Sequence, residues 1–193
     1  MENIIYSKAN RLNVIISFKG YILHVGLIEL PITSVTALSQ HGKHRALYLI
    51  DKNTNTFYSS STLPAKNEWV QMGLAKSGTI FWIKIKNRKD CCGERLSNIE
   101  ARVGEIETTV ENSSIILRNE LCGTYVGPGK DGEIVYIQCT RPLKGKYVTL
   151  RRRDDKEQII NIAEVAVFGK NLSKFNNYNI VQNFIVLLKN STT

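Results

Sequence analysis

Two arginines, an aspartate and two adjacent cysteines lie within one short stretch, from Arg88 to Arg95. A guanidinium group carries a permanent charge and a fork of N–H donors that suits paired oxygen atoms, and Asp90 could hold one fork in place. Exposed arginine–aspartate pairs are also common on protein surfaces and usually contribute little to stability. The combination with Cys91 and Cys92 indicates a binding site rather than a linker.

Cys91 and Cys92 are neighbours in the chain, which restricts their chemistry. Their Cα atoms lie about 3.8 Å apart across a trans peptide, closer than the roughly 4.4–6.8 Å of ordinary disulfides. A bond between them would close a small rigid ring with a flat sulfur face, on which a sugar ring could lie. Bridges to other cysteines, a metal site and free thiols are alternatives. Metal is the weakest, because zinc sites need four ligands, usually separated by two to four residues.

Residues 79–86 (TIFWIKIK) are the element that must position this stretch. They are rich in β-branched and aromatic residues, which predicts a strand. Side chains alternate between the faces of a strand, so Phe81 and the isoleucines after it share one face, and Trp82 and the lysines share the other. If the alternation continues, Arg88 and Asp90 emerge side by side on the second face, where the strand runs into a loop.

Bulk composition predicts one globular domain with extensions. The chain has 193 residues, of which 42% are hydrophobic and 22% charged. Its net charge of +9 raises the possibility of nucleic-acid binding, but lysines and arginines are scattered, and the densest cluster, at 151–153, is followed at once by two aspartates. We therefore expect no nucleic-acid partner. No catalytic triad or phosphate-binding glycine loop can be placed, so we expect no enzyme activity.

Four segments, taken together, resemble the F-type lectins, or fucolectins. The family motif ends in Arg-x-Asp-x4-Arg, usually with Cys-Cys after the aspartate, and residues 88–95 match it. The other three segments are NEWVQMGL at 67–74, CTRPLKGKYVT at 139–149 and AEVAVFG at 163–169. The resemblance covers about residues 27–169. It implies an all-β, jelly-roll β-sandwich of the galactose-binding-domain-like type.

This resemblance divides the chain into a sandwich domain over 27–170, an N-terminal extension over 1–26 and a C-terminal tail over 171–193. Short strands separated by turn signals agree with a sandwich. The first 26 residues show no clear signal peptide and are too interrupted by charges for a transmembrane helix.

The resemblance implies a site for terminal L-fucose, with Arg88 and Arg95 as hydrogen-bond donors and Asp90 orienting them. The Cys91–Cys92 ring would lie against the sugar. Tyr58 would form a wall of the pocket. The alternative is that Tyr58 is simply a half-buried tyrosine of a strand. His44 would border the pocket and contact the methyl end of fucose, and its alternative is a solvated loop histidine.

Ser61 marks a departure from the family. It lies where the motif has a histidine that donates to the axial hydroxyl of the sugar. Serine is shorter, and losing a buried hydrogen bond costs about 1–3 kcal/mol. The alternative function is therefore an adhesion or interaction module on the same fold, with altered or lost fucose binding.

Residues 49–58 (LIDKNTNTFY) resemble the calcium-binding segment of the family. Calcium prefers hard oxygen ligands, many of them backbone carbonyls. The implied ligands are the side chains or carbonyls of Tyr48, Asp51, Asn53, Ser61, Ala163 and Glu164. The alternative is an Asx-rich turn held by its own side-chain hydrogen bonds.

Cys122 and Cys139 flank an expected hairpin and could close a loop there. Pairing them, with Cys91 bonded to Cys92, leaves no odd thiol, which favours an oxidising compartment. Together with the cysteines, the resemblance implies a secreted protein that binds fucosylated glycans in innate-immune or cell-recognition roles. Weak single sites favour a homo-oligomer.

Overall fold

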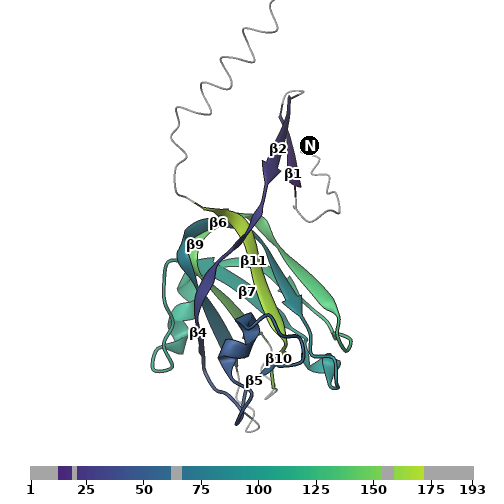
Figure 1. Ribbon diagram of the computed structural model, residues 1–193. Coiled ribbons are helices and arrows are strands. Elements are labelled where there is room, and N and C mark those ends of the chain that lie inside the picture. The colour runs from purple at the N-terminus through teal and green to yellow at the C-terminus, as the bar shows by residue number, and fades with distance from the viewer. Residues whose placement is uncertain (1–12, 19–20, 62–66, 154–158, 172–193) are drawn as a thin grey trace, which may run out of the picture.

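The computed structural model describes residues 13–18, 21–61, 67–153 and 159–171, and its regular structure is almost entirely antiparallel β (Figure 1). The strands are β1 Asn13–Phe18, β2 Tyr21–Gly26, β3 Ile28–Leu30, β4 Ile32–Ala37, β5 Tyr58–Ser59, β6 Trp69–Lys86, β7 Ile99–Gly104, β8 Glu120–Tyr125, β9 Ile134–Arg152, β10 Asn161–Ile162 and β11 Glu164–Asn171. Three short 3-10 helices complete it: η1 Ala46–Ile50, η2 Gly93–Arg95 and η3 Ser113–Arg118. None of the helices in the described part is long and apolar enough to cross a membrane.

Two long strands, β6 and β9, organise a jelly-roll β-sandwich. The first half of β6 pairs with β4 and with the second half of β9, and the second half of β6 pairs with β11 and with the first half of β9. The pairing of β6 with β9 is interrupted between Gly73 and Gly78. β7 and β8 extend one half of the sandwich and β3 the other, while β1 and β2 pair with each other. The predicted fold class is confirmed.

The core follows from the alternation of side chains along these strands. Ile83 and Ile85 of β6 are fully buried on one face, and Lys84 and Lys86 face outward and are half-buried, so the predicted alternation of these residues is confirmed. Phe81, which was expected on the same face as Ile83 and Ile85, is only half-buried, and Ile80 is the fully buried residue at this point of the strand, so that part of the prediction is wrong. Ile80 pairs with Gly169 of β11 and Trp82 with Phe168, so Phe81 between them is an extra residue in β6, and such a bulge changes the direction of its side chain.

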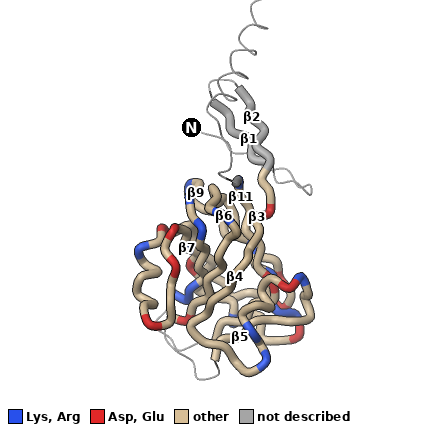
Figure 2. The backbone as a smooth tube through the Cα atoms, turned by 60° about the vertical axis from the view of Figure 1, so that its left-hand side comes forward, with Lys and Arg blue, Asp and Glu red and all other residues tan. Residues whose placement is uncertain are grey.

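Basic and acidic positions are interspersed over the described chain (Figure 2). At one end of the sandwich the two-residue strands β5 and β10 pair with each other, with Asn161 opposite Ser59 (Figure 1). Residues 88–95, which follow β6, meet this small sheet, so the end of the sandwich that carries β5 and β10 also carries the candidate site.

Candidate functional site

The stretch from Arg88 to Arg95, which we call the arginine loop, is fastened to the sandwich by a buried asparagine. The Asn87 amide nitrogen donates to the carbonyl oxygens of Gly93 (2.8 Å) and Lys130 (2.9 Å). The backbone N–H of Gly93 donates to Asp131 Oδ1 at 2.7 Å, and a Cβ at Gly93 would lie 2.5 Å from backbone atoms of the facing loop. Because the buried Asn87 amide binds carbonyl groups of both loops, it fixes the path of the arginine loop. Only glycine fits at position 93, where the two loops touch.

Arg88 is oriented by Asp90, as the sequence predicts. Its Nε donates to Asp90 Oδ1 at 2.9 Å and its NH2 to Oδ2 at 2.5 Å. Hydrogen bonds from the guanidinium lower the pKa of Asp90 to about 2, so this carboxylate stays ionised over the physiological range. Arg88 is 9% exposed, whereas the Asp90 side chain is 58% exposed. The exposed Asp90 carboxylate therefore orients the buried Arg88 guanidinium group from the side that faces solvent.

Asn161, on β10, joins the two arginines. In the amide orientation that satisfies its hydrogen bonds, its side-chain oxygen accepts from Arg95 NH1 (3.1 Å) and Arg88 NH1 (3.2 Å). Its nitrogen donates to Ile160 O and to Ser59 Oγ. The structure thus brings Arg88 and Arg95 together as predicted, through a residue that the prediction missed. One polar residue within the apolar run 159–163 was the available signal.

An aromatic stack covers the other side of Arg88. The Arg88 guanidinium carbon lies 3.9 Å from the ring centroid of Phe57, and the ring of His44 stacks on the same phenylalanine with centroids 4.1 Å apart. Burial, followed by the charge of neighbouring Lys43, lowers the pKa of His44. Through its stack on Phe57, His44 lies at the border of the arginine pair. Phe57 is a second site residue that the prediction missed.

Tyr58 does not form a wall of the site, and this prediction is wrong. Its side chain is fully buried and its hydroxyl donates to the Ser39 carbonyl at 2.9 Å. Side chains alternate along a strand, so the residue before it, Phe57, faces the arginines and Tyr58 faces the core. Ser61 is half-buried, and its backbone N–H donates to Ser39 Oγ at 2.8 Å. Residues 62–66, which follow it, lie outside the described residues.

Both predicted disulfides are present. Cys91 bonds to Cys92 in the arginine loop and is half-buried, with Cys92 at a φ of +64°. Cys122 of β8 bonds to Cys139 of β9. The first bond places two sulfur atoms beside the arginines, and the second ties the two halves of the sandwich together.

Asp51 and Glu164 bring two carboxyl groups together. Asp51 accepts from the Asn53 backbone N–H (2.8 Å) and from Thr56 Oγ1 (2.7 Å), so the Asx turn expected as the alternative is present. Burial, and then hydrogen bonding with Asp51, raises the pKa of Glu164 to about 7. Within the described residues, Glu164 Oε1 is buried without a hydrogen-bond partner.

Such an orphaned oxygen beside a second carboxylate fits an oxygen-liganded cation. No group of three or more His, Cys, Asp or Glu side chains is placed to hold a metal in the part of the chain that the structure describes. A cation at this point would therefore depend on backbone carbonyls and on amide or hydroxyl oxygens as well as on the two carboxyl groups.

Comparison with known proteins identifies the family to which the chain belongs. The model of the NedA-like, galactose-binding domain matches residues 48–150, which is more than half of the chain. The chain belongs to this family. Among its curated relatives are two from Anguilla japonica, Fucolectin-5 (35% identical over 124 residues, 62% of this chain and 61% of the relative) and Fucolectin-1 (32%, covering 62% and 65%). The resemblance to fucolectins is therefore confirmed, and the chain spans less than two thirds of the length of these relatives.

Solved structures agree on the fold of this galactose-binding domain. A fucolectin from the serum of Morone saxatilis superposes with a TM-score of 0.60 at 26% identity, over 70% of this chain and 46% of that one. The family 32 carbohydrate-binding module of Clostridium perfringens NanJ, in complex with galactose, superposes with a TM-score of 0.59 at 17% identity, over 73% and 99%. At that identity the second similarity concerns the fold alone.

Proposed function

We propose that the protein is a non-enzymatic lectin whose arginine loop binds terminal L-fucose. The observation that carries the proposal is the convergence of Arg88 and Arg95 on one neutral acceptor, Asn161. Asp90 and Asn161 together occupy three of the five N–H groups of Arg88, and Asn161 occupies one of Arg95. The remaining donors suit the adjacent hydroxyl oxygens of a sugar.

The surroundings of the arginines suit a deoxy sugar. The Cys91–Cys92 sulfur atoms offer a polarisable surface for one face of the ring, and the stack of His44 on Phe57 offers an apolar edge for the methyl group. Ser61 would have to supply, from a shorter side chain, the hydrogen bond that the family takes from a histidine. The names of the fucolectin relatives support fucose as the sugar.

We propose further that calcium binds beside the site. Asp51, Asn53 and Glu164 would supply side-chain oxygens and Tyr48 and Ala163 carbonyl oxygens, with Ser61 as a further ligand. The buried, orphaned Oε1 of Glu164 supports this. The ion would neutralise two adjacent carboxyl groups and tie the loop that carries Phe57 to β11, which holds the aromatic stack on Arg88.

The wider role that we propose is a secreted lectin in innate immunity or cell recognition, with homo-oligomers strengthening weak single sites. The fucolectin relatives support glycan binding. One titration with fucose distinguishes this lectin from the alternative, an interaction module that has lost fucose binding.

The test is calorimetric titration with L-fucose of the wild type, of Arg95→Ala and of a control, Arg118→Ala, an exposed arginine on η3. We expect heat of binding in the wild type and the control, and an affinity lower by about tenfold or more in Arg95→Ala, because charge-assisted hydrogen bonds are lost. Chelation of calcium should weaken the same titration and lower the melting temperature. No heat at high millimolar fucose would overturn the proposal and favour the interaction module.

A further inference from the structure

A cavity of about 400 Å³ opens on the outer face of the sheet beside the end of β6. This volume lies within the range typical of small-molecule sites, about 300–1,000 Å³. Three lysines, two glutamates and an apolar wall line it: Lys52, Lys84, Lys86, Glu29, Glu164 and Ile134. We call it the lysine cavity. The arginine loop contributes no residue to its lining.

The charges around the cavity are not balanced. Lys52 is paired with Glu29. Lys86 Nζ donates to the Gly132 carbonyl at 2.6 Å, which leaves two of its three N–H groups. Lys84 has no ion pair within the described residues, and its neighbours on the adjacent strands are Ala166 and Tyr136, neither of which is a carboxylate.

Lys84 is a half-buried residue whose ammonium group has no ion pair within the described residues, and a bound anion would supply a charge-assisted partner. Glu164 does not fill this role for Lys84, since its position on β11 is opposite Lys86, one of its oxygens is buried, and its carboxyl group hydrogen-bonds with Asp51. The site beside Lys84 and Lys86 is therefore suited to an anion from outside the chain.

The lysine cavity and the arginine loop are close enough to contact one oligosaccharide. Lys86 and Arg88 are two residues apart on the same run of chain, so their Cα atoms lie at most about 7 Å from each other. The loop after η1 borders both sites, because Thr54 lines the cavity and Phe57 stacks on Arg88.

From this juxtaposition we propose that the lysine cavity binds an acidic group, a sulfate ester or a carboxylate, on a sugar residue next to the fucose. The proposal rests on the proposed function, which supplies the position of the fucose. Lys84 and Lys86 donate to the oxyanion, and Ile134 packs against the carbon skeleton of the sugar that bears it.

The experiment uses one neutral fucosylated trisaccharide, the same trisaccharide with a sulfate ester on the neighbouring galactose, and its sialylated counterpart. Each is titrated into the wild type, Lys84→Gln and the control Lys76→Gln, which removes the same charge from an exposed position in the middle of the same strand. Galactose 6-sulfate, which contains no fucose, is titrated as a fourth ligand. Melting temperatures of all three proteins establish that they are equally folded.

We expect the wild type to bind at least one acidic trisaccharide about fivefold to tenfold more tightly than the neutral one, as one or two charge-assisted contacts would give. The gain should disappear in Lys84→Gln, persist in Lys76→Gln and shrink with added salt. The comparison of sulfated with sialylated ligand identifies which acidic group the cavity prefers.

Two outcomes would overturn the proposal: equal affinity of the wild type for neutral and acidic trisaccharides, or a gain that survives in Lys84→Gln. Failure of the proposed function gives a different result. In that case the neutral trisaccharide does not bind, and Lys84-dependent binding of galactose 6-sulfate would still support the anion site by itself.

Discussion

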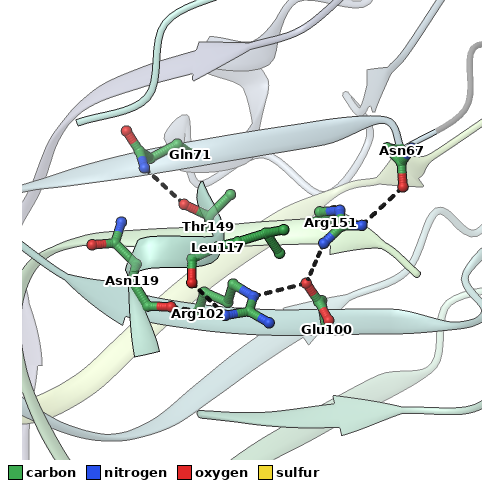
Figure 3. Close-up of polar contacts among 8 residues, drawn as sticks. All are labelled: Asn67, Gln71, Glu100, Arg102, Leu117, Asn119, Thr149 and Arg151. Carbon is green, nitrogen blue, oxygen red and sulfur yellow. Dashed lines mark hydrogen bonds and ion pairs between the residues drawn. The ribbon is translucent and has the colours of Figure 1, made fainter. Parts of the chain in front are cut away.

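Two pairs of arginines in the described part of the chain are each gathered around one acceptor, and the two acceptors differ in chemistry. In the arginine loop the acceptor is the neutral amide of Asn161. On the outer face of β7 and β9 it is the carboxylate of Glu100, which accepts from Arg102 Nε and Arg151 NH1, both at 2.8 Å (Figure 3). We call this second group the Glu100 network.

The remaining donors of the two pairs also differ. Arg102 NH1 donates to the carbonyls of Asn119 (2.8 Å) and Leu117 (3.3 Å), and Arg151 NH2 donates to Asn67 (2.9 Å) (Figure 3). These bonds fasten the segment around η3 over the sheet. In the arginine loop the carboxylate, Asp90, is exposed and binds Arg88 from outside, and donors remain for a ligand. Arginine pairs of similar composition therefore have their donors satisfied by the protein in one region and keep donors for the proposed ligand in the other.

The largest effect should come from Glu100→Gln. Its side chain is only 5% exposed, and removing one partner of a buried ion pair costs about 3 kcal/mol because charges are left uncompensated. Urea denaturation should show this loss, while the affinity of the folded protein for fucose stays unchanged. Glu120→Gln is the control, since Glu120 forms an exposed pair with Arg141, worth about 0–1 kcal/mol. Equal losses in the two variants would contradict the comparison.

Asn161→Ala should have the next largest effect, and mainly on binding. It leaves the two guanidinium groups without their common acceptor, so their orientation is lost, and we expect fucose affinity to fall by about tenfold, or 1.4 kcal/mol. Stability should fall by about 1–3 kcal/mol, because buried partners of the amide become unsatisfied. Asn67→Ala removes the asparagine from the Glu100 network and should leave calorimetric affinity unchanged. If both variants bind fucose like the wild type, Asn161 does not position the arginines.

Local spacing made part of the arginine loop predictable. Arg88, Asp90 and the cysteine pair interact within a few residues, so their arrangement follows from strand geometry and chain connectivity. The alternation of Ile83 and Ile85 with the lysines was predictable for the same reason. The proximity of Arg88 and Arg95 could be expected only because both residues flank a short loop.

The other features of the site depend on how strands that are distant in the sequence pair with each other. Asn161 reaches the arginines only because β10 pairs with β5, and nothing in its local sequence relates it to Arg88. Tyr58 and Phe57 differ by one position, and a shift of one residue exchanges the two faces of a strand. A shift in register between β6 and β11 likewise separated Phe81 from the face of Ile83 and Ile85. Such shifts depend on the pairing of whole strands, which local patterns do not specify.

Glu68 extends the comparison to a buried carboxyl group without an arginine. It is fully buried, its Oε1 accepts from Ser39 Oγ at 2.8 Å, and its Oε2 has no hydrogen-bond partner within the described chain. Burial raises the pKa of Glu68, and the hydrogen bond from Ser39 opposes this only in part. In Glu100 two arginines compensate the charge, whereas burial of Glu68 makes its charged form less favourable than in water.

The smallest expected effect, a pH-dependent change in melting temperature, follows from this difference between Glu68 and Glu100. A pKa that is higher in the folded than in the unfolded state means that the folded state binds the proton more tightly. The stabilising contribution of Glu68 is therefore complete below its unfolded pKa and is lost as the pH rises through its folded pKa. Glu68→Gln, which can still accept from Ser39, should match the wild type in melting temperature near pH 4 and exceed it by roughly 2–4 °C at pH 8. A constant difference at both pH values would show that Glu68 does not titrate on folding, and a lower melting temperature at pH 8 would mean that its charge is compensated in the same way as that of Glu100.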